Sequence, residues 1–281
     1  MTDLSTAPHP SFAGLGGLVD DYLRQQYERI AWGDLSLRRG ENVVHKTRVA
    51  VRRTRSTLRV FGSLFDADEA SALDTELAWY ADQLGRVRDL DVIRRTLESD
   101  LGTDPEGLFD PDATARLLGI LDAERDRAWG RLRAVLDEKR YRALRLRLDR
   151  WRDRPPFAAG AQDGAGTVDD YLRRARKKAD KRLRKAWAAA EVDADRALHR
   201  ARKAAKRARY AAELARPELG KPAKRMAKAY EERQESLGAN QDHVTVIALL
   251  RAAAASKAGA EIGFLCGVLA QRHVTAKAAL R

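Results

Sequence analysis

Residues 45–55, HKTRVAVRRTR, decide the fold because cations and packable side chains recur in them with the period of an α-helix. An α-helix turns about 100° per residue, so one stripe, spanning an arc of roughly 80° and a length of about 21 Å, holds His45, Arg48, Arg52, Arg55 and Arg59. The opposite side of the same helix carries Val51 and Leu58. This pattern predicts an amphipathic helix that buries one face and presents a row of cations on the other.

A second stretch, HRARKAAKRAR at residues 199–209, repeats this arrangement. Its histidine and four of its basic positions align with the first stretch without a gap, at an offset of 154 residues. Further along the chain, Leu84-Gly85 with Asp89 is echoed by Leu237-Gly238 with Asp242, at an offset of 153. Two matches in the same order predict an internal duplication.

A third basic helix is predicted beyond residue 168. One side of it carries Arg173, Lys177, Lys181 and Arg184. Like charges four residues apart destabilise a helix by a few tenths of a kcal/mol per pair, so three such helices imply an external anion that offsets the repulsion. The charges of this third helix surround more of its circumference, and a solvated surface is therefore a stronger alternative here than for the two histidine stripes.

The charge of the chain is concentrated in these three helices. The formal net charge is +13, yet residues 45–59, 173–185 and 199–209 alone carry +20, with Asp180 as their one acid. The rest of the chain therefore sums to −7. Cations gathered against an acidic background favour a binding site for a highly charged anion over a general solubility charge.

Composition and periodicity predict an all-α fold, since helix-forming residues dominate and only 6% of the residues are aromatic. Proline and glycine at 154–167 predict a linker. We expect one domain over 12–281, with a first helical lobe at 12–153 and a second at 168–281. The predicted helices are 15–37, 43–64, 68–84, 89–98, 113–136, 140–151, 168–189, 194–215, 221–237, 243–256 and 261–279.

The stripes suit a linear phosphate polymer, because guanidinium groups offer planar forks to phosphate oxygens and ammonium groups add point charge. A nucleic-acid reader is expected to add aromatic side chains for stacking, or Asn and Gln for base edges. Asn and Gln are missing from all three basic stretches, and Tyr210 is the one aromatic residue at the second stripe. The site is thus predicted to recognise backbone charge alone.

The motif His45-x-x-Arg48-Val49-x-x-Arg52-Arg53-x-Arg55, followed by Leu84-Gly85-x-x-Arg88-Asp89-x-Asp91-Val92 and by a second histidine motif at His199, resembles the CHAD family of conserved histidine α-helical domains. The resemblance covers roughly residues 12–281. It implies two pseudo-symmetric four-helix bundles with a basic cleft, and binding of inorganic polyphosphate. The second half departs from the first by Lys206 in place of Arg52 and by Asn240-Gln241-Asp242 in place of Val87-Arg88-Asp89, so unequal lobes are expected.

The candidate polyphosphate ligands are His45, Arg48, Arg52, Arg53, Arg55, Arg59, Arg173, Lys177, Lys181, Arg184, His199, Arg202, Lys203, Lys206 and Arg209. For the two histidines, phosphate contact is favoured over structural hydrogen bonding, and metal binding is disfavoured because cations surround each of them. Asp89, Asp91 and Asp242 are expected to cap helices or to orient arginines rather than to hold Mg²⁺. Cys266 is expected to be a small buried residue.

No catalytic residue, metal or cofactor is expected, since no G-x-x-x-x-G-K-[ST] phosphate loop occurs. The leading hypothesis is a non-catalytic accessory, targeting or regulatory module for inorganic polyphosphate. The alternatives are a non-specific nucleic-acid binder and, third, an enzyme acting on polyphosphate. The single cysteine and the lack of a signal peptide at the N-terminus predict a cytoplasmic protein, with polyphosphate granules and polyphosphate-associated proteins as expected surroundings and no membrane.

Overall fold

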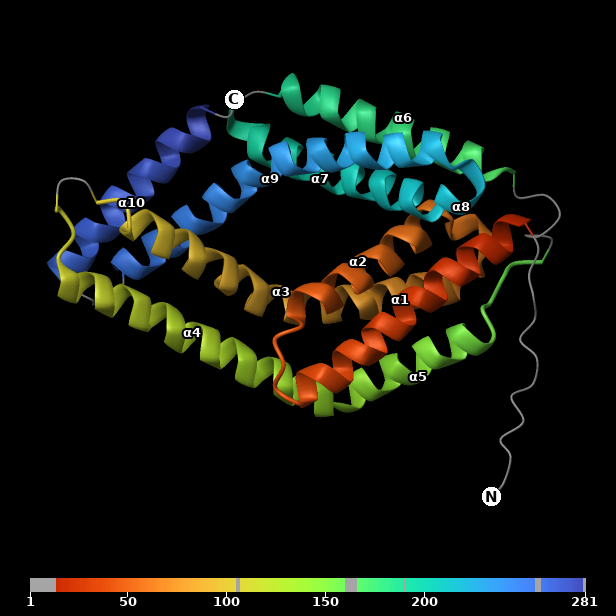
Figure 1. Ribbon diagram of the computed structural model, residues 1–281, viewed down its shortest axis with the longest axis horizontal. Coiled ribbons are helices and arrows are strands. Elements are labelled where there is room, and N and C mark those ends of the chain that lie inside the picture. The colour runs from red at the N-terminus through yellow and green to blue at the C-terminus, as the bar shows by residue number, and fades with distance from the viewer. Residues whose placement is uncertain (1–13, 105–106, 160–165, 190, 256–258, 280–281) are drawn as a thin grey trace.

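The computed structural model describes residues 14–104, 107–159, 166–189, 191–255 and 259–279. It contains α1 Gly14–Arg38, α2 Val44–Val60, the short 3₁₀ helix η1 Gly62–Leu64, α3 Ala67–Leu101, α4 Pro111–Asp137, α5 Lys139–Asp153, α6 Val168–Trp187, α7 Glu191–Leu214, α8 Arg216–Leu219, α9 Lys221–Ala255 and α10 Ala260–Ala279. Among the described residues the one β-type pairing is an isolated bridge between Phe65 and Phe157. The predicted all-α fold is confirmed (Figure 1).

Several helices begin at side chains that satisfy free backbone amides. The Asp66 carboxylate accepts from the Glu69 amide at 2.9 Å at the start of α3. At the start of α4, Asp110 accepts from Ala113 at 2.7 Å. Thr167 and Asp170 form a reciprocal capping box at α6. Such caps satisfy the unpaired N–H groups of a first helical turn and so fix where each helix begins.

The predicted breaks near residues 85–88 and 238–242 are wrong. Helices α3 and α9 run through these positions without interruption, so Asp89, Asp91 and Asp242 lie inside helices and cap none. Gly85 and Gly238 instead allow an arginine side chain from another helix to lie close to the backbone. A Cβ atom on Gly85 would lie 3.2 Å from Nη2 of Arg48, and one on Gly238 would lie 3.4 Å from Nη2 of Arg202.

Three clusters of buried side chains hold the helices together. The largest is built mainly by α1 to α5, and it also takes residues from α6, α7 and α9. A second belongs to α6, α7 and α9. The third joins the far ends of α3 and α4 to α9 and α10, which meet at the same end of the molecule in Figure 1. The two predicted lobes therefore share part of their core.

The linker predicted at 154–167 joins α5 to α6, and residues 160–165 lie outside the described part of the chain. Its first residues are anchored to the turn after α2, because the Ala158 amide donates to the Leu64 carbonyl at 2.9 Å. Cys266 is buried in the third cluster. No helix in the described ranges is long and apolar enough to cross a bilayer.

Candidate anion-binding site

The two basic stripes lie next to each other, since α2 packs against α7 near the middle of the molecule (Figure 1). Their cations, together with two from α3, act on one another electrostatically. We call this group the cationic cluster, and its members are His45, Arg48, Arg52, Arg88, Arg95, Arg202 and Lys206. The carboxylates that act on Arg202 and Lys206 within it are Asp89 and Asp242, so cations outnumber acids.

Arg48 is fixed in place by α3. Its guanidinium lies against the backbone of Gly85, and its Nη1 donates to Oδ1 of Asp89 at 3.2 Å. The side chain of Arg48 is 27% exposed and that of Asp89 is 53% exposed, so this ion pair orients Arg48 at a position that solvent still reaches. The arginine-orienting role expected for Asp89 is confirmed by this contact.

Arg202 occupies the equivalent position on α7, against Gly238 of α9. Its Nε is buried and has no hydrogen-bond partner among the described residues. Burial lowers the pKa of this guanidinium, and the charge of Asp242 counteracts the shift. A buried donor without a partner is costly, and a phosphate oxygen would satisfy it.

Lys206 is the most perturbed member of the cluster. Burial is the main cause, reinforced by the positive charges of Arg52 and Arg202, and together they lower the pKa of Lys206 from 10.5 to about 6. Its counterpart Arg52 donates to the hydroxyl of Tyr210 at 2.7 Å across the α2–α7 contact. At neutral pH the Lys206 amine is therefore largely uncharged until an anion approaches it.

His45 stands at the head of the α2 stripe and is exposed. Partial burial, followed by the charges of Arg88 and Arg52, lowers the pKa of its imidazole. His199 is likewise exposed, near the start of the α7 stripe. Both histidines can therefore reach a ligand without rearrangement of the helices.

A second group of cations continues the site toward the end of α2. Arg55 and Arg59 share the carboxylate of Asp74 on α3, at 2.9 Å and 2.7 Å. Arg207 of α7 faces them, and Arg182 of α6 acts on Arg207 as well. We call Arg55, Arg59, Arg182 and Arg207 the distal group. Beside it lies a pocket of about 420 Å³ to which Arg182, Lys185 and Arg200 contribute.

The two sides of the α2–α7 contact are unequal. On one side Arg53 forms a double hydrogen bond with Glu213, at 3.0 and 2.7 Å. At the positions related to this pair by the 154-residue offset stand Arg207, in place of Arg53, and Arg59, in place of Glu213, and the charge of Arg59 acts on Arg207. One side is closed by an ion pair, and the other gathers like charges.

The remaining predicted ligands are dispersed. Arg209 is paired with Glu213 and Glu231 at 2.9 and 2.6 Å, which gives it a structural partner on α9. Arg173 is paired with Asp170 at 2.6 Å at the start of α6. The other predicted residues are exposed and point away from the buried side of their helices: Lys177, Lys181, Arg184 and Lys203.

Sequence reasoning missed Arg88, Arg95, Arg182 and Arg207 as members of the site. Arg88 stood in the quoted motif, and a continuous α3 would have placed it one turn from Gly85 and near Arg48. The helical period puts Arg207 outside the arc of the α7 stripe. The cations that act on it are Arg55 and Arg59 of α2 and Arg182 of α6. Only the packing of α6 on α7 shows its role.

No group of three or more metal-binding side chains occurs in the part of the chain that the structure describes. Asp91 pairs with Arg125 at 2.7 Å instead of standing free as an oxygen ligand. The chemistry that the site offers is thus cationic, with guanidinium, ammonium and imidazole donors that suit phosphate oxygens.

The fold and the site define an all-α protein in which two adjacent helices concentrate positive charge. The CHAD domain family matches residues 21–251, so the chain belongs to this family. Two solved structures are similar over nearly their whole length. PptA from Streptomyces chartreusis is 21% identical, with a TM-score of 0.76 and coverage of 96% of this chain and 97% of that one. The CHAD domain from the plant Ricinus communis is 24% identical, with a TM-score of 0.74 and coverage of 100% and 93%. No curated protein matches this chain.

Proposed function

We propose that this protein binds inorganic polyphosphate through the cationic cluster and the distal group, as a non-catalytic accessory, targeting or regulatory module. One observation carries the proposal: Arg202 and Lys206 are largely buried beside Arg48 and Arg52, with too few carboxylates to balance them. Burying like charges together raises the free energy of the unliganded protein. A bound multivalent anion attracts each of these cations and so makes their proximity favourable. We expect this role in the cytoplasm, near polyphosphate granules and the proteins bound to them.

A polymer suits the site better than a single phosphate group. The α2 stripe is 15 residues long from His45 to Arg59, or about 21 Å at the rise of an α-helix. Along this length the cationic cluster gives way to the distal group, so successive phosphates of one chain can meet successive guanidinium groups. Arg48 donates to Asp89 through Nη1 and is partly exposed, so its other N–H groups are donors for such a chain.

The alternative of non-specific nucleic-acid binding rests on the same phosphate contacts. Tyr210 at the cluster is buried, and its hydroxyl is held by Arg52, so it offers no stacking face there. Competition separates the two ligands. Excess long-chain polyphosphate is expected to strip bound duplex DNA, whereas excess duplex should hardly displace polyphosphate. The reverse order of displacement would favour the nucleic-acid function.

The third candidate, an enzyme acting on polyphosphate, is tested by incubation with polyphosphate and Mg²⁺ or Mn²⁺. We expect binding without release of inorganic phosphate. Release that scales with protein concentration, and that disappears in an Arg48→Glu, Arg52→Glu variant, would make the site catalytic.

A further inference from the structure

A second set of titratable side chains lies outside the cationic cluster, at the end of the molecule where α3 meets α9 and α10 (Figure 1). His273 of α10 is 5% exposed, and its Nε2 lies 2.9 Å from Oδ2 of Asp100 in the last turn of α3. On the other side of the same ring, Nδ1 lies 2.7 Å from Nδ1 of His243 of α9. We call Asp100, His273 and His243 the histidine clasp, because these contacts tie α10 to both of the other helices.

The hydrogen bonds of the clasp fix where its protons lie while both rings are uncharged. The Asp100 carboxylate only accepts, so His273 donates to it from Nε2–H. In a neutral ring the other nitrogen is then an acceptor, and His243 donates to it from its own Nδ1–H. One arrangement of protons therefore satisfies both contacts.

The closed clasp can take up one further proton but not two. One added proton still leaves an Nδ1–H on one ring and an Nδ1 lone pair on the other, so the hydrogen bond between the rings persists and carries a charge. Two added protons leave two Nδ1–H groups facing each other at 2.7 Å, with a positive charge on each ring and no acceptor between them. Double protonation is thus incompatible with the closed contact.

The charges acting on His243 do not remove this conflict. Burial is the main cause that lowers the pKa of its imidazole, and the charges of His273 and Lys277 on α10 lower it further. Asp242 on the same helix and Asp100 on α3 act in the opposite direction, yet the pKa of His243 remains below its ordinary value. The environment of the clasp therefore resists a charge on this ring.

The other charged groups near α10 have contacts of their own. Lys277 is paired with Asp195 of α7 at 2.6 Å. Arg272 donates to a backbone carbonyl just after α3 at 3.1 Å. The ion pair between α10 and α4, Glu261 with Arg116, lies at the opposite end of α10. Lys277 and Arg272 are cations, so they supply no acceptor that could keep two protonated rings together.

From this geometry we infer that the histidine clasp is a pH-operated lock, which holds α10 against α3 and α9 at neutral pH and releases α10 when both histidines are protonated. The inference does not depend on the proposed binding of polyphosphate. Once α10 is released, each imidazole titrates near the ordinary histidine pKa of about 6.5, so the open form holds one more proton than the closed form in acid. Linkage then predicts that the open population rises by at least about tenfold between pH 7.5 and 5.

Cys266 provides a probe for the release of α10. It is the one cysteine of the chain, and it is buried in the third cluster on α10, two helical turns before His273 and on the same side. Its reaction with 4,4′-dithiodipyridine requires that α10 move away from its neighbours. Dividing the rate in urea by the rate in buffer at each pH gives a protection factor that is corrected for ionisation of the thiol. This factor should fall by at least about tenfold from pH 7.5 to 5.

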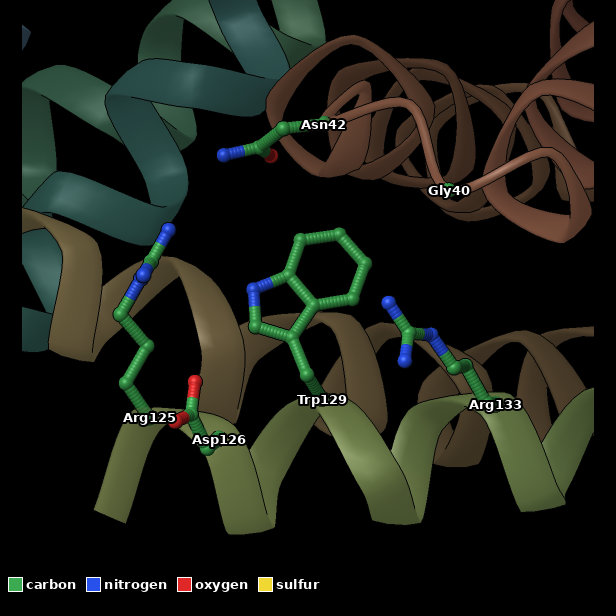
Figure 2. Close-up of a pocket in the computed structure, with 6 residues that line it drawn as sticks. All are labelled: Gly40, Asn42, Arg125, Asp126, Trp129 and Arg133. Atoms are coloured by element: carbon green, nitrogen blue, oxygen red, sulfur yellow. The ribbon is translucent and has the colours of Figure 1, made fainter. Parts of the chain in front are cut away.

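Tryptophan fluorescence shows whether the loss of protection is local. None of the five tryptophans lies on α9 or α10. Trp129 is 9% exposed in the largest core cluster, and Figure 2 shows it with Arg125 and Arg133 on either side. The emission maximum should therefore stay constant while Cys266 becomes reactive. A shift of the maximum in step with Cys266 would mean that the whole protein unfolds, and would overturn the inference.

His243→Gln is the decisive variant. A glutamine amide can keep a hydrogen bond to His273 but takes up no proton, so the protection of Cys266 should stay nearly constant between pH 7.5 and 5. Gln271→Ala, at an exposed position on α10, is the matched control and should lose protection as wild type does. Constant protection in wild type would overturn the inference, as would an equal loss in wild type and His243→Gln. Either result leaves polyphosphate binding untouched, so the two proposals fail separately.

Discussion

Replacing Lys206 by methionine should stabilise the free protein while weakening its binding of polyphosphate. Methionine has a similar length and no charge, so it fills the same space beside Arg52 and Arg202. In the folded protein the pKa of Lys206 is about 6, against 10.5 in the unfolded chain. Each unit of pKa corresponds to about 1.4 kcal/mol, so at pH 7 this residue costs the free protein on the order of 5 kcal/mol.

The pH dependence has a definite sign. Between pH 6 and 10.5 the unfolded chain holds the Lys206 proton and the folded protein does not, so the stability of wild type rises with pH across this range. The cost is absent above about pH 10.5 and complete below about pH 6. The Lys206→Met variant lacks this contribution, and its stability should change less with pH than that of wild type.

Urea unfolding followed by circular dichroism, at several pH values, measures both effects. Lys203→Met is the matched control, because Lys203 is an exposed lysine on the same helix and its replacement should shift the unfolding free energy by no more than about 0.5 kcal/mol. A Lys206→Met protein no more stable than wild type at pH 7 would refute the reasoning, as would identical pH slopes in the two proteins. The same variant should bind long-chain polyphosphate more weakly than wild type, which would show stability given up for function.

Three further predictions concern the two histidines, Gly85 and Gly33. In wild type the affinity for long-chain polyphosphate should rise as the pH falls from 8 to 6, because a bound phosphate raises the pKa of His45, which burial and neighbouring arginines lower in the free protein. Replacing His45 and His199 together by glutamine should make this rise smaller. Equal pH slopes in titrations of the two proteins would return both histidines to a structural role. Gly85→Ala should stabilise α3 by up to about 1 kcal/mol yet weaken polyphosphate binding, since its Cβ would lie 3.2 Å from the Arg48 guanidinium; thermal unfolding and titration together check this, and unchanged affinity would mean that the position of Arg48 is unimportant. Gly33→Ala should destabilise the protein by about 1–3 kcal/mol, because the added Cβ would overlap Oγ1 of Thr47. Gly119→Ala is the control and should be neutral or stabilising, since open space surrounds that position. Similar urea midpoints for the two variants would contradict this packing.

The helices and the basic stripes could be predicted from sequence because their signals are local. The stripe on α2 depends only on the 3.6-residue period, and the structure places His45, Arg48 and Arg52 as that period requires. The repeat of the motif at residues 199–209 likewise placed Arg202 and Lys206 on the equivalent side of α7.

The breaks predicted in α3 and α9 show where local reasoning fails. Leu-Gly followed by Asp resembles the end of one helix and the cap of the next. In the structure, Gly85 and Gly238 instead admit guanidinium groups that belong to other helices. A glycine that ends a helix and one that admits a neighbouring side chain look the same in sequence, and only tertiary contact separates them.

Packing between helices also decided which cations have partners. Arg53 and Arg209 carry the same charge as Arg52, yet Arg53 pairs with Glu213 of another helix, and Arg209 pairs with Glu231 of α9 in addition to Glu213 one turn away on its own helix. Arg182 and Arg207 come together because α6 packs on α7, which no periodicity within either helix indicates. The composition of the site thus depends on long-range contacts, while its sign of charge was evident from sequence.

The central claim is tested most directly by titrating wild type and an Arg48→Glu, Arg52→Glu variant with polyphosphates of graded chain length. The control is Arg131→Glu, Arg142→Glu, which changes the net charge equally at exposed positions on α4 and α5. We predict that wild type and the control bind longer chains more tightly and lose affinity steeply between 50 and 200 mM salt, as expected when several phosphates shed counterions. The variant should lose binding with its circular dichroism unchanged. Equal binding by the variant and the control, both folded, would contradict a polyphosphate site at the cationic cluster.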